Sequence, residues 1–191
     1  MNDSFSSGLE PLADHALTGP HGDDPTIAET MNFWAYDGQR DLALNIHARI
    51  HNGEMRGGVT LFLPGGRILR QRDDAPARFD DGSAPRSSHV QYRCIEPFRR
   101  WSYAIDRLPA FATSDAAQAA GTIADEQPTC TFSARLDGVV AAPAWRNGTL
   151  TTEARQQMAG PGGLWLAGRA RSGIRPDCFR YDQLLEVTGE I

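Results

Sequence analysis

One acidic residue stands just ahead of an aromatic cluster. Glu29 precedes Phe33, Trp34 and Tyr36. If this segment is extended, Asn32, Trp34 and Tyr36 point to the same side, because side chains alternate along a strand. A carboxyl group among aromatic walls in a dry cavity could act as a general acid and protonate an alkene or an enol. The same pattern suits a structural role, in which Trp34 and Tyr36 close one end of a barrel and Glu29 pairs with an arginine.

Histidines and cysteines offer no metal-binding pattern. His47 and His51 lie four residues apart in the segment LALNIHARIH. On a strand this spacing separates them by ~13 Å, so one metal ion could not take both, and we expect His47 to face solvent or a ligand. The chain has three cysteines, Cys94, Cys130 and Cys178, and no two of them form a CxxC pair. Two of them fall at apolar strand positions, where we expect buried, inert thiols rather than zinc ligands.

The motif EPFRRW, residues 96–101, sets two arginines beside a tryptophan. Arg99 or Arg100 could stack on Trp101 or pair with Glu96, whereas an inward arginine would bind a carboxylate or an enolate. Adjacent strand residues point to opposite faces, so at least one of the two arginines must lie outside. Two tyrosines could each offer a hydroxyl to a ligand or belong to the core, namely Tyr103 and Tyr181.

These candidate residues lie on segments with the two-residue period of a β-strand. In residues 42–51 the alternation has no fault, with Leu42, Leu44, Ile46, Ala48 and Ile50 on one face and Asn45, His47, Arg49 and His51 on the other. The period returns in runs that begin at Val59, Val90, Trp101, Cys130 and Phe179. Six such runs predict an all-β protein: an antiparallel barrel or strongly curved sheet that encloses a space.

Turn residues divide the runs. Asp37-Gly38 predicts a hairpin, further turns are expected at residues 52–58, at 64–66 and at Asp137-Gly138, and Pro97 predicts a bend. Residues 73–88 have the composition of a loop. One or two short helices are expected in loops, near residues 115–120 and 149–158.

Length and composition exclude several classes of function. A chain of 191 residues suits one domain, here a flexible arm at 1–25 and a β domain at 26–191. All 19 basic residues are arginines, dispersed in a chain of net charge −5, so we expect neither a lysine Schiff base nor nucleic-acid binding. The absence of GxSxG and of nucleotide-binding glycine loops predicts no hydrolase elbow and no cofactor. No apolar run approaches the ~20 residues of a membrane span, and the N-terminus does not look like a secretory signal, so we expect a cytoplasmic protein.

The order of motifs resembles a known group. The resemblance spans about residues 26–191 and is carried by ETMNFWAYDGQRDLALNIHARIH, GGVTLFLPGGRILR, VQYRCIEPFRRWSYAID and FRYDQLLEVTGEI. These segments resemble the first half of the lipocalin-like bacterial proteins related to carotenoid 1,2-hydratase (the hydroxyneurosporene synthase type). Members of that group are usually about twice as long, and their second barrel opens on Arg-Asp-His-Ser-Trp-Gly, which this chain does not contain. The resemblance therefore implies a fold and an apolar class of ligand, and it carries over no catalytic residue.

We predict a lipocalin-like barrel that binds a hydrophobic small molecule, such as a terpenoid, a steroid or a polycyclic aromatic compound, in a cavity above ~300 Å³. The expected lining is Trp34, Tyr36, Trp101, Tyr103, Phe132 and Tyr181, with Glu29, His47 and Arg99 as polar candidates. A second hypothesis is a cofactor-independent hydratase, isomerase or cyclase in which Glu29 is the acid. A third is one half of a larger assembly, either a homodimer or a barrel completed by a second barrel domain on another chain.

Overall fold

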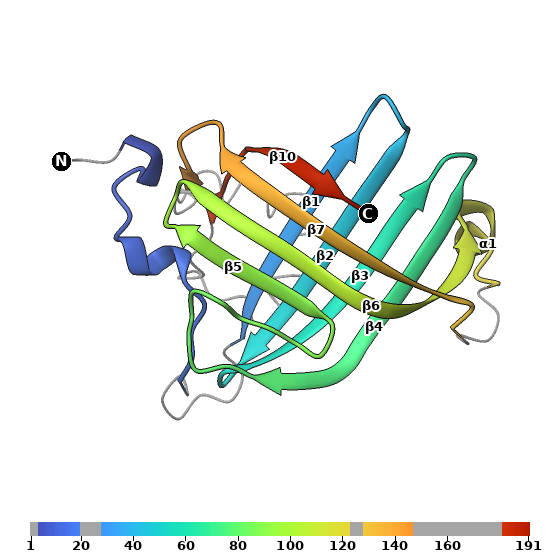
Figure 1. Ribbon diagram of the computed structural model, residues 1–191, viewed down its shortest axis with the longest axis horizontal. Helices are drawn as coiled ribbons and strands as arrows, with labels where there is room; N and C mark the ends of the chain where they lie inside the picture. The colour runs from blue at the N-terminus through green and yellow to red at the C-terminus, as the bar shows by residue number, and fades with distance from the viewer. Residues whose placement is uncertain (1–3, 20–27, 123–127, 147–180) are drawn as a thin grey trace, which may run out of the picture.

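The computed structural model describes residues 4–19, 28–122, 128–146 and 181–191, and it confirms an all-β antiparallel fold (Figure 1). The strands are β1 (Glu29–Asp37), β2 (Leu42–His51), β3 (Glu54–Leu63), β4 (Arg67–Arg78), β5 (Val90–Glu96), β6 (Arg100–Ser114), β7 (Cys130–Val140), β8 (Trp145–Arg146), β9 (Tyr181–Asp182) and β10 (Leu185–Glu190). Three short helices accompany them: the 3-10 turns η1 (Ser4–Ser6) and η2 (Pro11–Asp14), and α1 (Asp115–Ala119).

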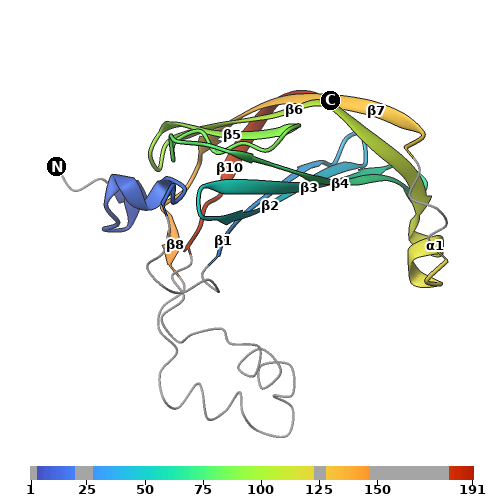
Figure 2. The same cartoon turned by 90° about the horizontal axis from the view of Figure 1, so that it is seen from below.

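Eight strands form one strongly curved sheet. Its order is β1-β2-β3-β4-β6-β7-β10, with β5 paired to β6, and every pair is antiparallel. Figure 2 shows β1–β4 facing β5, β6, β7 and β10, with the N-terminal turns at one end and α1 at the other. Among the described residues β1 and β10 do not pair with each other, so the barrel-like sheet is nearly closed but keeps a seam between these two edge strands.

The long strand β6 joins the two halves of the sheet. Its last residues, from Phe111, pair with β4, whereas the part before them pairs with β7 and, near its start, with β5. A register shift between Ile105 and Leu108 interrupts the β6–β7 ladder, and Arg107 in this shift has a φ of 45°. Bulges of this kind bend a strand, which lets β6 turn from one half of the sheet into the other.

The core lies between the two halves. Leu44, Ile46, Ala48 and Ile50 of β2 are fully buried, as the alternation predicts, and they face an aromatic group from β5 and β6. The Tyr92 hydroxyl reaches across the core from β5 and donates a hydrogen bond to the Ile46 carbonyl, at 2.7 Å. This contact ties β5 to β2.

Several local expectations are confirmed. The Asp37 carboxylate accepts hydrogen bonds from the backbone N–H groups of Gln39 and Arg40 and so closes the β1–β2 hairpin. The helix expected near residues 115–120 is α1 (Asp115–Ala119), which the Ser114 hydroxyl caps by accepting the N–H of Ala117. Pro97 lies between β5 and β6. The helix expected near residues 149–158 lies outside the described residues.

Other expectations were wrong. Asp137-Gly138 is not a turn, because β7 continues to Val140 and its residues pair with both β6 and β10. Gly138 lies at a buried position opposite Trp101, where a Cβ would meet Tyr103 and Leu185 at 3.4 Å. Close packing, rather than a turn, therefore explains the glycine. The predicted loop at 73–88 is shorter than expected, since β4 extends to Arg78.

Part of the arm expected at 1–25 contacts the β domain. Its residues 4–19 hold both 3-10 turns, and their backbone is bonded to the β domain, with Ala16 donating to the Gly82 carbonyl and Phe5 accepting from Ala144. Asp14 and Ala16 are buried. The segment has no apolar period, yet these hydrogen bonds and a buried carboxylate hold it against the sheet.

Candidate functional site

A pocket of about 580 Å³ lies at the seam between the two edge strands. Residues 28–34 form one wall, the segment 183–185 leading into β10 forms another, and the end of η2 with His15 contributes a third. The remaining lining comes from Tyr92, Trp101 and Tyr103. Four of the predicted site residues therefore line one pocket, namely Glu29, Trp34, Trp101 and Tyr103.

The register of β1 decides which of its side chains enter the core. Phe33 pairs with Ile46, whose side chain is fully buried, whereas Trp34 pairs with Asn45. Directly paired residues share a face, so Phe33 points inward and Trp34 outward. The expected inward set of Asn32, Trp34 and Tyr36 is thus on the outer face: Trp34 is 60% exposed and stacks on Phe62, although it still contributes to the rim of the pocket.

The inner wall of the pocket is an aromatic stack. The rings of Phe33 and Tyr103 lie 3.8 Å apart and nearly parallel, and Trp101 stacks on Tyr103 at 6.3 Å. Tyr92 meets Tyr103 edge to face, at 5.3 Å. Trp101 and Tyr103 follow each other at alternate positions of β6, which places both rings on the same face. Such a wall offers flat, apolar contact to a ring-containing or unsaturated ligand.

Asp14 supplies a buried carboxylate to this pocket. One of its oxygens, Oδ2, accepts hydrogen bonds from the backbone N–H of Phe98 at 2.7 Å and from Nε1 of Trp101 at 3.1 Å. The Cys94 thiol donates to the same oxygen at 3.7 Å. These donors offset the loss of water around a carboxylate that is only 2% exposed. Sequence reasoning missed Asp14, because nothing local distinguishes it from the other acids of the N-terminal segment.

Burial and the Asp14 charge together keep the neighbouring acidic groups protonated. Burial is the larger cause, and the nearby carboxylate the smaller one, of the raised pKa of the Tyr103 hydroxyl. The same two effects raise the pKa of Cys94 to about 12. Tyr103 therefore keeps its proton at ordinary pH and can donate a hydrogen bond, and Cys94 is not a thiolate nucleophile.

Glu29, the predicted acid, begins β1 and points to the inner side of the sheet. It is partly exposed, and its Oε2 accepts the backbone N–H of Leu17 at 2.9 Å. This hydrogen bond ties the N-terminal segment to the edge strand. Glu29 thus contributes to the pocket wall, while the deeply buried acid of the pocket is Asp14.

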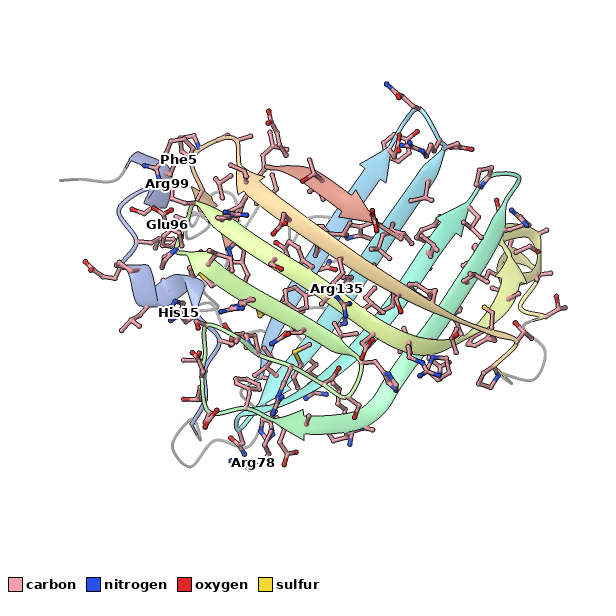
Figure 3. The ribbon with its side chains drawn as sticks, viewed as in Figure 1. Phe5, His15, Arg78, Glu96, Arg99 and Arg135 are labelled. Carbon is pink, nitrogen blue, oxygen red and sulfur yellow. The ribbon has the colours of Figure 1, made fainter. Side chains whose placement is uncertain are left out.

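The remaining predicted residues lie elsewhere. His47 is exposed on β2, and Phe132 is partly buried on β7 against the core. Arg99 lies at the end of the sheet, with its guanidinium 4.0 Å from the ring centroid of Phe5 (Figure 3), so it packs on the N-terminal segment rather than in the pocket. The side chain of Tyr181 lies outside the described residues. Cys130, expected to be buried, is exposed at the first residue of β7.

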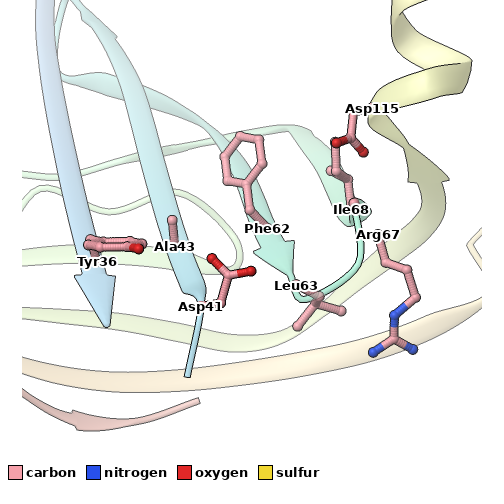
Figure 4. A pocket seen from close by; sticks show the side chains of 9 residues that line it. Tyr36, Asp41, Ala43, Phe62, Leu63, Arg67, Ile68 and Asp115 are labelled. Atoms are coloured by element: carbon pink, nitrogen blue, oxygen red, sulfur yellow. The ribbon is translucent and has the colours of Figure 1, made fainter. Parts of the chain in front are cut away.

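Tyr36, also predicted to line a cavity, belongs to a second and smaller pocket of about 290 Å³ (Figure 4). This second pocket lies at the opposite end of β1, where Phe62 and Ile68 meet Asp115. Tyr36 is 72% exposed there. Five of the predicted residues therefore line two separate hollows, four in the seam pocket and Tyr36 in the smaller one.

Within the part of the chain that the structure describes, no cluster of three or more His, Cys, Asp or Glu side chains is arranged to hold a metal ion. None of the helices there is long and apolar enough to cross a membrane. No family model, curated protein or solved structure matches the chain.

Proposed function

We propose that this protein binds a hydrophobic small molecule of the terpenoid, steroid or polycyclic aromatic class in the seam pocket. The observation that carries the proposal is a hollow of about 580 Å³ walled by stacked aromatic rings. Ligand pockets typically measure ~300–1,000 Å³ and combine a mostly apolar lining with a few polar groups. Here the apolar part includes Met31 and Leu185, and the polar part includes Asp14. The resemblance to proteins related to carotenoid 1,2-hydratase stays a prediction that agrees with this class of ligand.

Native mass spectrometry of the purified protein tests the proposal directly. We expect a retained apolar compound, which is released when the protein is denatured and identified in the organic extract. In parallel, the stripped protein should bind a hydrophobic fluorescent probe. A protein that carries no compound and binds no apolar probe would contradict the proposal.

A pair of leucine variants locates the binding site. Leu184 is 66% exposed and lines the pocket, whereas Leu12 is 76% exposed and does not. Leu184→Asp should weaken probe binding about tenfold, since it removes apolar contact and places a charge where the ligand must lose water. Leu12→Asp is the matched control and should bind as the parent does. Equal losses in both variants would place the binding site elsewhere.

A second candidate function is a cofactor-independent lyase or isomerase. The buried Asp14 carboxylate at the pocket favours it, because a carboxyl group in a dry apolar site can transfer protons. In an isomerase, the carboxylate would take a proton from a carbon of the ligand and return it to another carbon, so the residue is regenerated. Two N–H groups donate to Oδ2 and fix the orientation of this carboxylate. Asp14 is buried, whereas Glu29, first expected to be the acid, is partly exposed.

Incubation of the protein with the compound identified by mass spectrometry separates the two candidates. A catalyst converts that compound, and Asp14→Asn stops conversion while it still binds the ligand. Recovery of the unchanged compound from the parent protein after prolonged incubation would contradict the catalytic candidate and support binding only.

A further inference from the structure

We propose that the ligand of the seam pocket carries an uncharged carbonyl oxygen, which accepts a hydrogen bond from the side-chain amide of Gln183. This inference rests on the proposed binding function and makes it more specific. It concerns the polar groups of the pocket.

Gln183 lies between β9 and β10, beside the two leucines of the pocket wall. Its side-chain nitrogen, Nε2, is buried, and no acceptor among the described residues lies within hydrogen-bond reach of it. Buried amide groups are nearly always paired, because an unpaired one has lost its water without compensation. Gln183 lines the seam pocket, so we infer that an acceptor on the ligand, reached by a turn of this side chain, completes the hydrogen bond.

Tyr103 adds a second donor to the same pocket. Its hydroxyl keeps its proton because burial raises its pKa, and the residue lines the pocket. Each of the two carboxylates of the pocket, by contrast, already accepts a hydrogen bond from the protein. Asp14 accepts from Phe98 and Trp101, and Glu29 accepts from Leu17. The seam pocket thus offers donors to a ligand.

The charges around the pocket disfavour an anionic ligand. Its titratable groups are Asp14, Glu29, His15, Tyr92 and Tyr103. The two carboxylates would repel a carboxylate ligand, and no arginine lines the pocket among the described residues to offset them. A ketone or an aldehyde meets both requirements, since its oxygen accepts hydrogen bonds without a charge.

Three tricyclic probes that differ at one position test this inference on the full-length protein. They are fluorene, fluorenone and fluorene carboxylate, titrated by calorimetry. We expect fluorenone to bind three- to tenfold more tightly than fluorene, the range expected for one added hydrogen bond, and the carboxylate to bind more weakly than both. Equal affinities for fluorene and fluorenone, or tightest binding of the carboxylate, would overturn the inference.

Variants then assign the hydrogen bond. Gln183→Leu should abolish the preference for fluorenone while it binds fluorene as the parent does, and Gln183→Glu, which keeps the shape of the side chain, should lose the same preference. Gln118→Leu on α1 is the matched control and should keep it. A preference that survives both Gln183 variants overturns the assignment. Because each variant is judged by the ratio of two probes, partial unfolding does not imitate the result. Fluorene that binds without any carbonyl preference overturns this inference alone, whereas failure of all three probes to bind counts against the proposed function as well.

Discussion

The buried carboxylate of Asp14 should be a main support of the N-terminal segment. Replacement by alanine removes the acceptor of two buried donors, the Phe98 N–H and the Trp101 Nε1–H. Each buried donor left without a partner costs ~1–3 kcal/mol, so the two together cost ~2–6 kcal/mol. The variant also no longer has to bury a charge, which offsets part of that loss. We therefore expect Asp14→Ala to lower the free energy of unfolding by ~3 kcal/mol, equivalent to a fall in Tm of about 6–12 °C for a chain of this size.

Asp14→Asn separates the hydrogen bonds from the charge. Its carbonyl oxygen can still accept from both donors, but neutral hydrogen bonds are weaker than charged ones by ~1 kcal/mol each. The asparagine variant should lose roughly half as much stability as the alanine variant. Asp80→Ala, at an exposed aspartate, is the matched control and should change stability by less than ~0.5 kcal/mol.

Equilibrium unfolding in urea measures these differences, and the intrinsic fluorescence of the protein reports the transition because Trp101 is buried beside the substituted side chain. The reasoning would be refuted if Asp14→Ala unfolded within ~0.5 kcal/mol of the parent, or if asparagine proved as costly as alanine.

Two further predictions concern pH and backbone conformation. Burial raises the pKa of Cys94 from 9.0 to about 12 and also raises the pKa values of Tyr92 and Tyr103. A group whose pKa is higher in the folded state than in the unfolded state stabilises the fold fully at a pH below its unfolded-state pKa, and this stabilisation is lost as the pH rises through its folded-state pKa. The urea midpoint should therefore fall steadily above about pH 9. A constant midpoint up to about pH 11 would contradict this. The chain has no lysine, which leaves cysteine and tyrosine as the side chains that titrate in this range. Gly53 and Gly65 both have positive φ, but a Cβ on Gly53 would clash with the Thr18 carbonyl oxygen, whereas a Cβ on Gly65 meets nothing within 4 Å. Gly53→Ala should therefore cost ~1–3 kcal/mol more than Gly65→Ala in thermal unfolding, and equal costs would show that the contact with Thr18 is unimportant.

Strand alternation made the fold predictable. Residues 42–51 show which face is buried, because β2 lies in the interior of the sheet and has one dry face. The same reasoning placed Trp101 and Tyr103 on one face of their strand. The alternation did not predict the inward face of β1, because aromatic residues occupy both odd and even positions of that strand. Only the pairing of Phe33 with Ile46 shows which of them face the core. At Asp137-Gly138 a local turn signal conflicted with long-range pairing, and the pairing to β6 and β10 prevailed.

The polar part of the site was harder to predict from the sequence. Asp14 reaches the pocket only because the N-terminal segment folds back on the β5–β6 turn. There its carboxylate accepts a hydrogen bond from the N–H of Phe98. The residues that meet there are more than eighty positions apart. Gln183 is a candidate only because its buried amide nitrogen has no hydrogen-bond partner among the described residues. This depends on the folded surroundings of the side chain, so the sequence alone could not predict it.

The seam between β1 and β10 bears on how a bulky guest would enter. In a fully closed barrel, a rigid molecule wider than the mouth must pull neighbouring strands apart and break the hydrogen bonds between them. No ladder joins β1 to β10 among the described residues, so these two edges can spread while every existing strand pair stays intact. Lateral entry would then require the shifting of side chains such as Trp34 and Leu184 at the rim, and the main-chain framework would remain as it is.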